Sequence, residues 1–374
     1  MIHAPLQGIR ILDLTRVLAG PLATMTLGDL GADVIKVERP EIGDETRGWG
    51  PPFDSRGESA YYLSINRNKL SIALDLDSPA DFDIMRRLVD GADAVLDNFR
   101  PGTLERRGLD IATFLDSNPR LVWCTITGFG PESERPGYDF VVQAESGWMA
   151  ITGEPDGTPT KVGVALADVL AGKDAAIAIL AGLSARARHR PPSARRVFVS
   201  LFHTAVGALV NVAQNTLVTG RDARRWGNAH ANLVPYQLFL AADRPIVIAV
   251  GNDVQWQHCV RVLALDSLGD DEALATNAGR LQHRDRVVDA ISARVRERPA
   301  ADWLEALAAA GVPAGVVHTV REALDGVGAS ALTGVPPLAP GTVRLPPPRL
   351  DEHGGLVRRF GWDAFRHATG SEQT

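Results

Sequence analysis

The sequence contains little that would point to disulfides, nucleic acid or metal. Only two of its 374 residues are cysteines, Cys124 and Cys259, and both lie in apolar segments typical of core thiols. The net charge of −6 argues against a nucleic-acid partner, although local basic patches could still bind a phosphorylated small molecule. The histidines are scattered and lack the spacing of a metal site.

Long apolar runs are also missing. Residues 169–186 come closest to a membrane span, but Lys173 and Asp174 interrupt them, and no run reaches the roughly 18 residues that a span needs. Residues 1–8 lack the apolar region of a signal peptide. We therefore expect a cytoplasmic protein with no membrane partner, no nucleic-acid partner and no metal.

Strand-like and helix-like patterns alternate through the first two-thirds of the chain. Helical patterns cover residues 21–30 and 79–90, and a third begins near Asp168. The expected strands are 9–14, 32–38, 71–76, 94–96, 121–126 and 197–200. Strands separated by helices of this length indicate an α/β fold with a parallel sheet and right-handed crossovers.

The pattern changes near Trp226. Residues 234–240 and 246–250 predict an antiparallel hairpin. Helices are expected at about 253–265, 283–297 and 301–310, with a strand at 312–317. This part predicts a smaller α+β domain, and the Pro-rich residues 336–349 are expected to be irregular.

Asp168 stands at the start of the long apolar helical stretch, among small and aliphatic neighbours. Free N–H groups and the macrodipole at a helix start favour the ionised form of a carboxylate, and an ionised carboxylate in a protected site can act as a nucleophile. The alternative is an N-cap, because Asp is a common capping residue. From this residue alone, the capping role is favoured.

The opening strand, helix and strand also permit a dinucleotide-binding interpretation. Glu38 stands where an acidic residue often holds a ribose. However, residues 14–22 contain no Gly-x-Gly-x-x-Gly motif, and Arg39 is an unfavourable neighbour for NAD. An NAD(P)-binding oxidoreductase therefore remains a secondary alternative.

A series of short motifs follows in order along nearly the whole chain. They are ILDLTRVLAGP (11–21), LGADVIKVERP (30–40), GDETRG (43–48), NRNKLSIALDL (66–76), DNFRPG (97–102), GYDF (137–140), ITGEPDG (151–157), the Asp168 segment (160–172), GNAH (227–230), PYQ (235–237) and PPRL (347–350). Together they resemble the class III CoA-transferase family, a group that includes formyl-CoA transferase, carnitine CoA-transferase and the α-methylacyl-CoA racemases.

The resemblance implies that Asp168 is the catalytic nucleophile. In this family the aspartate forms a mixed anhydride with the acyl group and then a thioester with CoA, so coenzyme A and acyl-CoA are substrates and no cofactor is bound permanently. Positioning and desolvation make a carboxylate competent for such exchange.

The resemblance also implies a set of CoA-binding residues. Arg39 and Arg106 match positions that meet the phosphate end, where a guanidinium can pair with phosphate oxygens. Asp77 stands where formyl-CoA transferase-like sequences carry Lys. Arg47 is a candidate for the distal carboxylate of a dicarboxylic acid, with a structural tie in the loop as its alternative. The remaining matched positions are Leu18, Ala19, Leu74, Asn98, Phe99, Arg100 and Tyr138.

Tyr138 separates transferase from racemase. In the racemases a His occupies this position and shares acid/base work with the aspartate, and a Glu stands near the position of Val254. Tyrosine, with a pKa near 10, is a poor base at neutral pH. We therefore expect a transferase, with a racemase or epimerase as the alternative. The GNAH motif and residues 251–253 resemble members that handle dicarboxylic acids, often with succinyl-CoA as donor.

Domain organisation and assembly also follow from the resemblance. It implies a Rossmann-like CoA-binding domain over residues 1–200, completed by about 331–374. A linker helix over 201–225 would lead to a small α+β domain over 226–330. Family subunits are ring-shaped and form interlocked homodimers.

Overall fold

The computed structural model describes residues 4–187 and 191–370. The chain divides into two compact units. The first comprises Met1–Trp148, Lys161–Arg221 and Leu324–Thr374, and the second Met149–Thr160 and Asp222–Ala323. Among the described helices, none is both long and apolar enough to cross a membrane.

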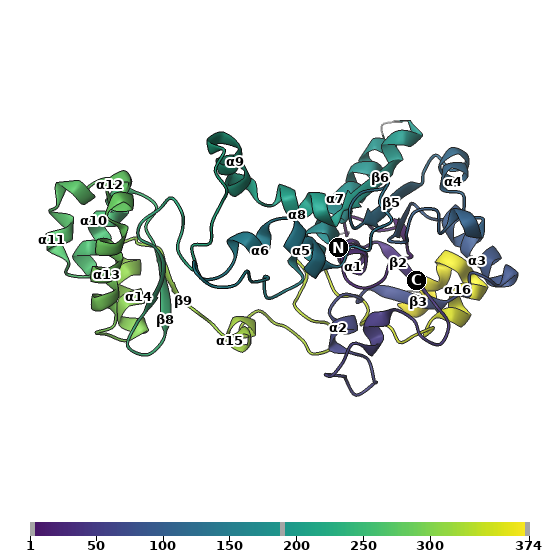
Figure 1. Ribbon diagram of the computed structural model, residues 1–374. Coiled ribbons are helices and arrows are strands. Elements are labelled where there is room, and N and C mark those ends of the chain that lie inside the picture. Colours follow the sequence, from purple (N-terminus) through teal and green to yellow (C-terminus); the bar gives the residue numbers. More distant parts are fainter. Residues whose placement is uncertain (1–3, 188–190, 371–374) are drawn as a thin grey trace. The chain divides into compact units, whose positions relative to one another are not determined.

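A six-stranded parallel sheet forms the centre of the first unit (Figure 1). Its strands lie in the order β3-β2-β1-β4-β5-β6, so the direction of chain progression reverses between β1 and β4. All six predicted strands are confirmed within a few residues. Their bounds are β1 Arg10–Asp13, β2 Asp33–Glu38, β3 Lys69–Ala73, β4 Ala94–Asp97, β5 Val122–Thr127 and β6 Arg196–Ser200.

Alternate residues of the strands pack into two separate apolar cores, one on each face of the sheet. Ile11 and Val34 belong to one core and Leu12 and Ile35 to the other, because successive side chains of a strand point to opposite faces. Helices α1 (Ala19–Asp29) and α7 (Leu166–Ala187) contribute to the first core, and α3 (Pro79–Asp90), α4 (Ile111–Ser117), α16 (Gly354–Phe360) and α17 (Ala364–Ala368) are on the other side. Both faces of the sheet are thus covered, which explains why nearly all residues of β1 to β5 are buried, the charged Asp13, Lys36 and Lys69 included.

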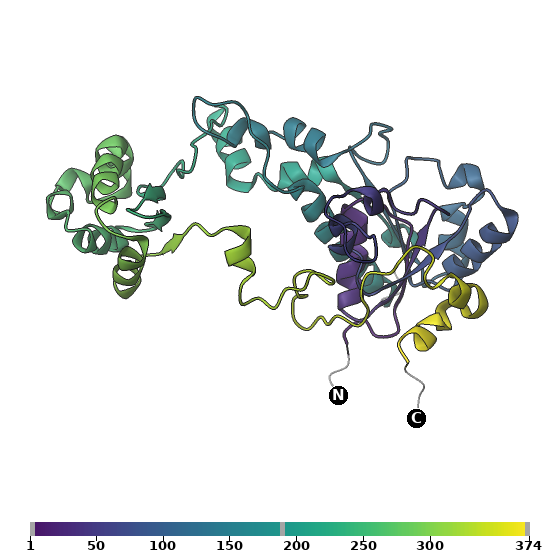
Figure 2. The ribbon, with the colours of Figure 1, turned by 90° about the horizontal axis from the view of Figure 1, so that it is seen from below.

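The last part of the chain returns to the first unit (Figure 2). The His353 N–H donates to the Ser71 carbonyl at 3.0 Å, and the Asn68 N–H donates to the Leu345 carbonyl at 2.9 Å. Residues 336–349 contain neither helix nor strand, as the proline content predicts.

The segment after β6 differs from the single helix expected over 201–225. It forms two helices, α8 (Leu201–Gly207) and α9 (Val210–Thr219), and the helix ends before Gly220. Val210 has a φ of 44°, which a continuous α-helix does not allow.

Shorter helical elements complete the first unit. These are η1 Glu45–Gly48, α2 Ala60–Leu63, η2 Glu105–Arg107, α5 Asp139–Glu145, η3 Pro192–Arg195 and η5 Gly361–Asp363, with α6 Trp148–Ile151 and α15 Val320–Leu324 at two of the four boundaries between the units.

The second unit is built on a small antiparallel sheet in the order β7-β8-β9. The predicted hairpin is confirmed as β7 (Tyr236–Leu240) and β8 (Pro245–Ala249), and β9 is Ala314–Val316. Trp256 and Trp303 are fully buried in its core. The packed helices are α10 Asp253–Val262, α11 Asp266–Gly269, η4 Glu272–Leu274, α12 Asn277–Gln282, α13 Arg284–Val295 and α14 Ala300–Ala309.

Candidate active site

Two adjoining pockets lie at the carboxyl ends of the parallel strands. The smaller has a volume of about 230 Å³ and the larger about 650 Å³. Arg16, Phe99 and Arg100 line both, so the pockets meet where the loops after β1 and β4 face each other. In open α/β sheets, ligands bind at the carboxyl ends of strands where the strand order reverses.

Most of the sequence-predicted site residues line one of these pockets. Leu18, Ala19, Asn98, Tyr138 and Asp168 line the smaller pocket. Arg39 and Leu74 line the larger one, and Phe99 and Arg100 line both.

Arg106 is the exception among the expected CoA-binding residues, because it lines neither pocket. Its Nη2 donates to Thr103 Oγ1 at 3.2 Å, beside the larger pocket. The neighbouring Arg107 does line that pocket, and it pairs with Asp77 at 3.1 Å.

Asp168 is the third residue of α7, but it does not cap the helix. Asp139 from α5 takes that role, since its Oδ1 accepts from the Ala167 N–H at 2.8 Å and the Asp168 N–H at 3.4 Å. The buried Gln143 amide donates to the other Asp139 oxygen at 2.7 Å. The Asp168 carboxylate itself accepts no hydrogen bond from any described residue, so it is free for a ligand.

This environment corrects the expectation that the helix start favours an ionised Asp168. Burial, followed by the charge of Asp139, raises the pKa of Asp168 to about 7 from an ordinary 3.8. The helix N–H groups are already occupied by Asp139, so their stabilisation does not reach Asp168. A carboxylate with few donors is poorly solvated and is more nucleophilic once it is ionised.

Tyr61 from α2 lies close enough to Asp168 to feel its charge. Burial, and next the Asp168 charge, raise the pKa of Tyr61 to about 12. The phenol therefore stays protonated, and its ring packs edge-on against Trp49 with centroids 5.1 Å apart. A protonated phenol can donate a hydrogen bond to an oxygen that develops negative charge.

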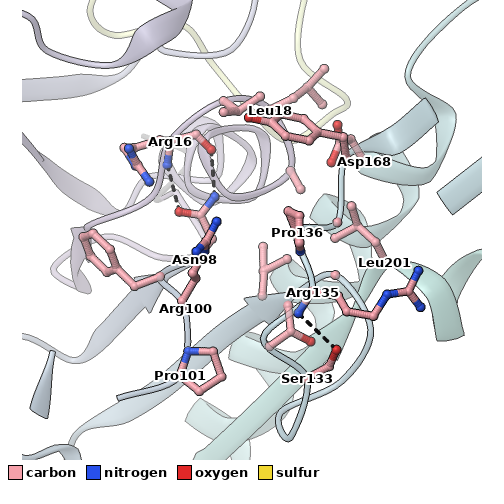
Figure 3. A pocket seen from close by; sticks show the side chains of 18 residues that line it. Arg16, Leu18, Asn98, Arg100, Pro101, Ser133, Arg135, Pro136, Asp168 and Leu201 are labelled. Atoms are coloured by element: carbon pink, nitrogen blue, oxygen red, sulfur yellow. Dashed lines mark hydrogen bonds between the residues drawn. The ribbon is translucent and has the colours of Figure 1, made fainter. Parts of the chain in front are cut away.

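The turn after β1, which lines both pockets, is held by four hydrogen bonds from three side chains. The Asn98 side chain accepts from the Arg16 N–H at 3.1 Å and donates to the Arg16 carbonyl at 2.8 Å (Figure 3). Lys36 Nζ donates to the Thr15 carbonyl at 2.8 Å, and Asp44 Oδ1 accepts from the Val17 N–H at 3.3 Å. These contacts hold Val17 at a φ of 72°, a strained conformation for a β-branched residue.

Two buried lysines below this turn are paired with two aspartates. Lys69 Nζ lies 2.9 Å from Asp13 Oδ2, and Lys36 Nζ lies 3.0 Å from Asp44 Oδ2. Burial lowers the pKa of Lys69 to about 8, although Asp13 opposes the shift. Burial also disfavours the charged form of Lys36, but Asp44 and Asp13 outweigh it and raise its pKa. Each charge is thus neutralised locally, as buried charges require.

Arg47 is not available to a substrate. It is 9% exposed and lines neither pocket, and its guanidinium contacts Glu38 at 2.7 and 2.8 Å and Glu58 at 2.8 Å. It also donates to the Tyr62 hydroxyl at 2.6 Å. Arg47 is therefore the structural tie. Because Glu38 is held by Arg47, it is not free to bind the ribose of a dinucleotide.

The loop that leads from β5 to Tyr138 is closed by two glycines. A methyl group added to Gly128 would lie 2.5 Å from the Gly137 Cα, and one added to Gly137 would lie 2.1 Å from the Gly128 Cα. Both residues line the smaller pocket. This backbone contact fixes the start of α5, and thereby the positions of Tyr138 and Asp139.

Sequence reasoning missed Arg16, Tyr61 and Asp139. Asp139 directly follows Tyr138 in the GYDF motif, so its acidic side chain was a visible signal. Tyr61 had no comparable signal, because its relation to Asp168 depends on how α2 packs. Arg16 was part of a matched motif but was not separated from its neighbours.

Comparisons with known proteins agree with the geometry. The family model described as CoA-transferase family III matches residues 6–353. A mouse succinyl-CoA:glutarate CoA-transferase is 44% identical over 85% of this chain and 73% of its own length. A succinate–glutarate CoA-transferase of Agrobacterium fabrum is 43% identical over 85% of this chain and 81% of its own.

A solved structure extends the agreement to the fold. The crystal structure of a CaiB/BaiF family protein from Brucella suis matches with a TM-score of 0.82 and 40% identity, and the match covers 95% of this chain and 99% of that one. The sequence motifs, the parallel sheet and the nearly full-length matches lead to one assignment. This chain belongs to CoA-transferase family III.

Proposed function

We propose that this CoA-transferase moves CoA from succinyl-CoA to a dicarboxylic acid, with glutarate as the first candidate acceptor. The observation that carries the proposal is the Asp168 carboxylate, which accepts no hydrogen bond from any described residue and lies in a pocket that adjoins a larger one lined by Arg16, Arg39 and Arg100. The choice of donor and acceptor is supported by the relatives that carry these substrates in their names, at 42–44% identity.

In the proposed complex, the CoA nucleotide occupies the larger pocket. Arg39 and Arg100 supply cations there for the phosphates, and Leu74 supplies apolar surface. The pantetheine arm passes between Arg16 and Phe99, which line both pockets, and brings the thioester to Asp168. Tyr138, 62% exposed at the smaller pocket, is free to contact the arm.

The first half of the proposed reaction transfers CoA to the enzyme. An Asp168 oxygen attacks the thioester carbonyl of succinyl-CoA, the C–S bond breaks, and a succinyl–aspartyl anhydride and CoA thiolate form. The thiolate attacks the aspartyl carbonyl, which releases succinate and leaves an aspartyl-CoA thioester. Confinement of the reacting groups in one pocket is the source of the rate enhancement.

The second half transfers CoA to the acceptor. A carboxylate of the acceptor attacks the aspartyl-CoA carbonyl and displaces the thiolate, which gives a second mixed anhydride. The thiolate then attacks the acceptor's carbonyl, so the new acyl-CoA leaves and the Asp168 carboxylate is regenerated. Tyr61, whose phenol stays protonated and senses the Asp168 charge, is a candidate donor to the oxyanions that form on the Asp168 side.

A racemase reaction is less well supported. It would need two acid/base groups around the α-carbon of the acyl chain. Among the described residues that line the smaller pocket there is no histidine, and Tyr138 occupies the relevant position.

We further propose that the ring-shaped subunit and the interlocked homodimer of the family apply to this chain. Val210, Leu217 and Val218 on α9 are 69–78% exposed, and such an apolar surface is consistent with burial in an assembly. Sedimentation analysis of the full chain would find a dimer, and a monomeric mass would contradict this part of the proposal.

Trapping the Asp168 adduct tests the proposed function. The protein is incubated with succinyl-CoA alone, treated with hydroxylamine or borohydride, and digested for mass spectrometry. We expect modification of Asp168, and none in Asp168→Asn. Asp174→Asn is the matched control, because Asp174 lies exposed on the same helix. Among the described residues, its carboxylate bonds only to Thr204.

The acceptor is tested with the same proteins. Succinyl-CoA and a series of mono- and dicarboxylic acids are supplied, and the product CoA thioesters are separated. We expect glutaryl-CoA with the wild type and with Asp174→Asn. CoA transfer by Asp168→Asn at the wild-type rate would refute the mechanism, and a preference for monocarboxylic acids would refute the proposed acceptor class.

A further inference from the structure

Glu45 links two of the arginines that line the larger pocket, Arg16 and Arg39. Its Oε1 pairs with Arg16 Nη1 and with Arg39 Nη2, the latter at 3.2 Å. Both arginines line the larger pocket. The three side chains are only partly covered, with Arg39 53%, Arg16 36% and Glu45 34% exposed. The Glu45 carboxylate thus lies where the two guanidinium groups converge.

The pairing leaves hydrogen-bonding capacity unused on both sides. A single carboxylate oxygen serves both guanidinium groups, although each could form a two-pronged contact with an oxyanion. The second oxygen, Glu45 Oε2, and the Arg16 Nε are buried and have no hydrogen-bond partner among the described residues. A phosphate offers more acceptor oxygens and more charge than one carboxylate oxygen, so it suits this pair of arginines better.

The backbone at Glu45 is fixed by its neighbours, whereas its side chain, among the described residues, is held by Arg16 and Arg39. The preceding residue, Asp44, is buried, pairs with Lys36 and accepts from the Thr46 N–H at 3.0 Å. The Asp44 N–H in turn donates to Glu38 at 3.0 Å. An incoming anion would therefore displace the Glu45 carboxylate by side-chain rotation and leave the loop in place.

We propose that Glu45 is an internal substitute for a CoA phosphate, which holds Arg16 and Arg39 in the free enzyme and is displaced when CoA binds. This inference rests on the proposed function, because it requires CoA in this cleft. Competition from Glu45 weakens CoA binding, since only the fraction of molecules with free arginines is competent. A transferase that must release one acyl-CoA after each turnover benefits from that weakening.

The variant Glu45→Gln tests the proposal. It keeps the shape of the side chain but removes the charge that competes with phosphate. Calorimetry with CoA is expected to show binding about 5-fold to 10-fold tighter than in the wild type, the gain that follows if the paired state dominates the free enzyme. Titration with 3′-dephospho-CoA distinguishes the ribose phosphate from the diphosphate, because the gain persists only if the diphosphate is the group that displaces Glu45.

Two controls separate competition from other effects. Glu41→Gln removes a charge from the lining of the larger pocket, at a residue that has no ion pair with any described arginine. It therefore measures the general field effect, and we expect less than about a 2-fold gain. Pantetheine, which lacks phosphate, should bind Glu45→Gln and wild type equally. Equal gains in the two Gln variants, a gain with pantetheine, or weaker CoA binding by Glu45→Gln would each overturn the proposal.

The same proteins show whether the failure lies here or in the proposed function. If succinyl-CoA modifies Asp168 in the wild type while Glu45→Gln binds CoA no more tightly, Glu45 merely orients the arginines and the proposed function stands. If the wild type neither binds CoA nor is modified at Asp168, the proposed function itself is refuted.

Discussion

The raised pKa of Asp168 predicts that activity increases steeply between pH 6 and pH 8. The nucleophile is the ionised form, and burial together with Asp139 raises the pKa of Asp168 to about 7. At pH 6 about one-eleventh of Asp168 is ionised and at pH 8 about ten-elevenths, so kcat/KM for succinyl-CoA should rise about 10-fold over this range. The assay is initial-rate kinetics with a saturating acceptor acid across this range.

Replacement of Asp139 by Asn should move that inflection to lower pH. The substitution removes the like charge that disfavours ionisation of Asp168, while burial, the larger cause, remains. An Asn oxygen can still accept from the Ala167 N–H and cap α7, and thermal unfolding would verify that the fold is retained. An inflection that stays in place, or that moves upward, would refute the assigned role of Asp139.

The same pKa gives a stability prediction with a definite sign. A carboxyl group whose folded-state pKa is raised contributes stability that is fully present below its unfolded value of 3.8 and is lost as pH rises through about 7. Asp168→Asn should therefore be more stable than the wild type at pH 8, but not at pH 4. A pKa raised from 3.8 to about 7 corresponds to at most about 4 kcal/mol of unfolding free energy, which solvent access to this partly exposed group reduces to the order of 1–2 kcal/mol.

Urea denaturation at the two pH values decides between two views of the helix start. If the N–H groups and macrodipole of α7 dominated, the ionised carboxylate would be stabilising, and Asp168→Asn would be the less stable protein at pH 8. That result would show that Asp139 does not occupy the helix start as described.

Two further substitutions test how the site is supported. Gly172→Ala would place a methyl group 2.6 Å from the Ala19 carbonyl oxygen, so α7 must move away from α1. We expect the free energy of unfolding to fall by about 1–3 kcal/mol. The control is Gly163→Ala, whose methyl group would meet nothing within 4 Å and should change the urea midpoint little. Lys69→Met leaves Asp13 buried without its partner and should lower the free energy of unfolding by about 3–5 kcal/mol. The double variant that also carries Asp13→Asn should recover much of that loss. Equal losses in the single and double variants would contradict a charge pair between Lys69 and Asp13.

Much of the sheet was predictable because strands buried on both faces have a simple signature. Segments such as 94–96 and 121–126 are apolar, short and separated by helical patterns, so their existence and order along the chain followed directly. The break between α8 and α9 did not follow. The sequence around residues 205–210 has no proline, and nothing in it marks Val210 as the residue that takes a φ of 44°.

The site was predictable in its residues but not in its electrostatics. Asp168 was identified by its motif, yet its pKa depends on Asp139, which is 29 residues away in sequence. Arg47 was offered as a substrate ligand because of the resemblance to members that handle dicarboxylic acids, and its turn-residue neighbours supported only the alternative, a structural tie. Its partner Glu58 lies 11 residues further on, and Tyr62 lies 15 residues further on. Such contacts have no local signature, so only the fold could assign them.

The contact between Gly128 and Gly137 has a consequence for how this site tolerates change. Neither residue carries a functional group, yet any side chain at either one would push apart the strand end and the start of α5. Tyr138 and Asp139 would then move together, and with them the charge that tunes the nucleophile. A mutational scan for loss of CoA transfer should therefore detect Gly128 and Gly137, although neither has a reactive side chain. Here the direct contact of two backbone segments positions the site.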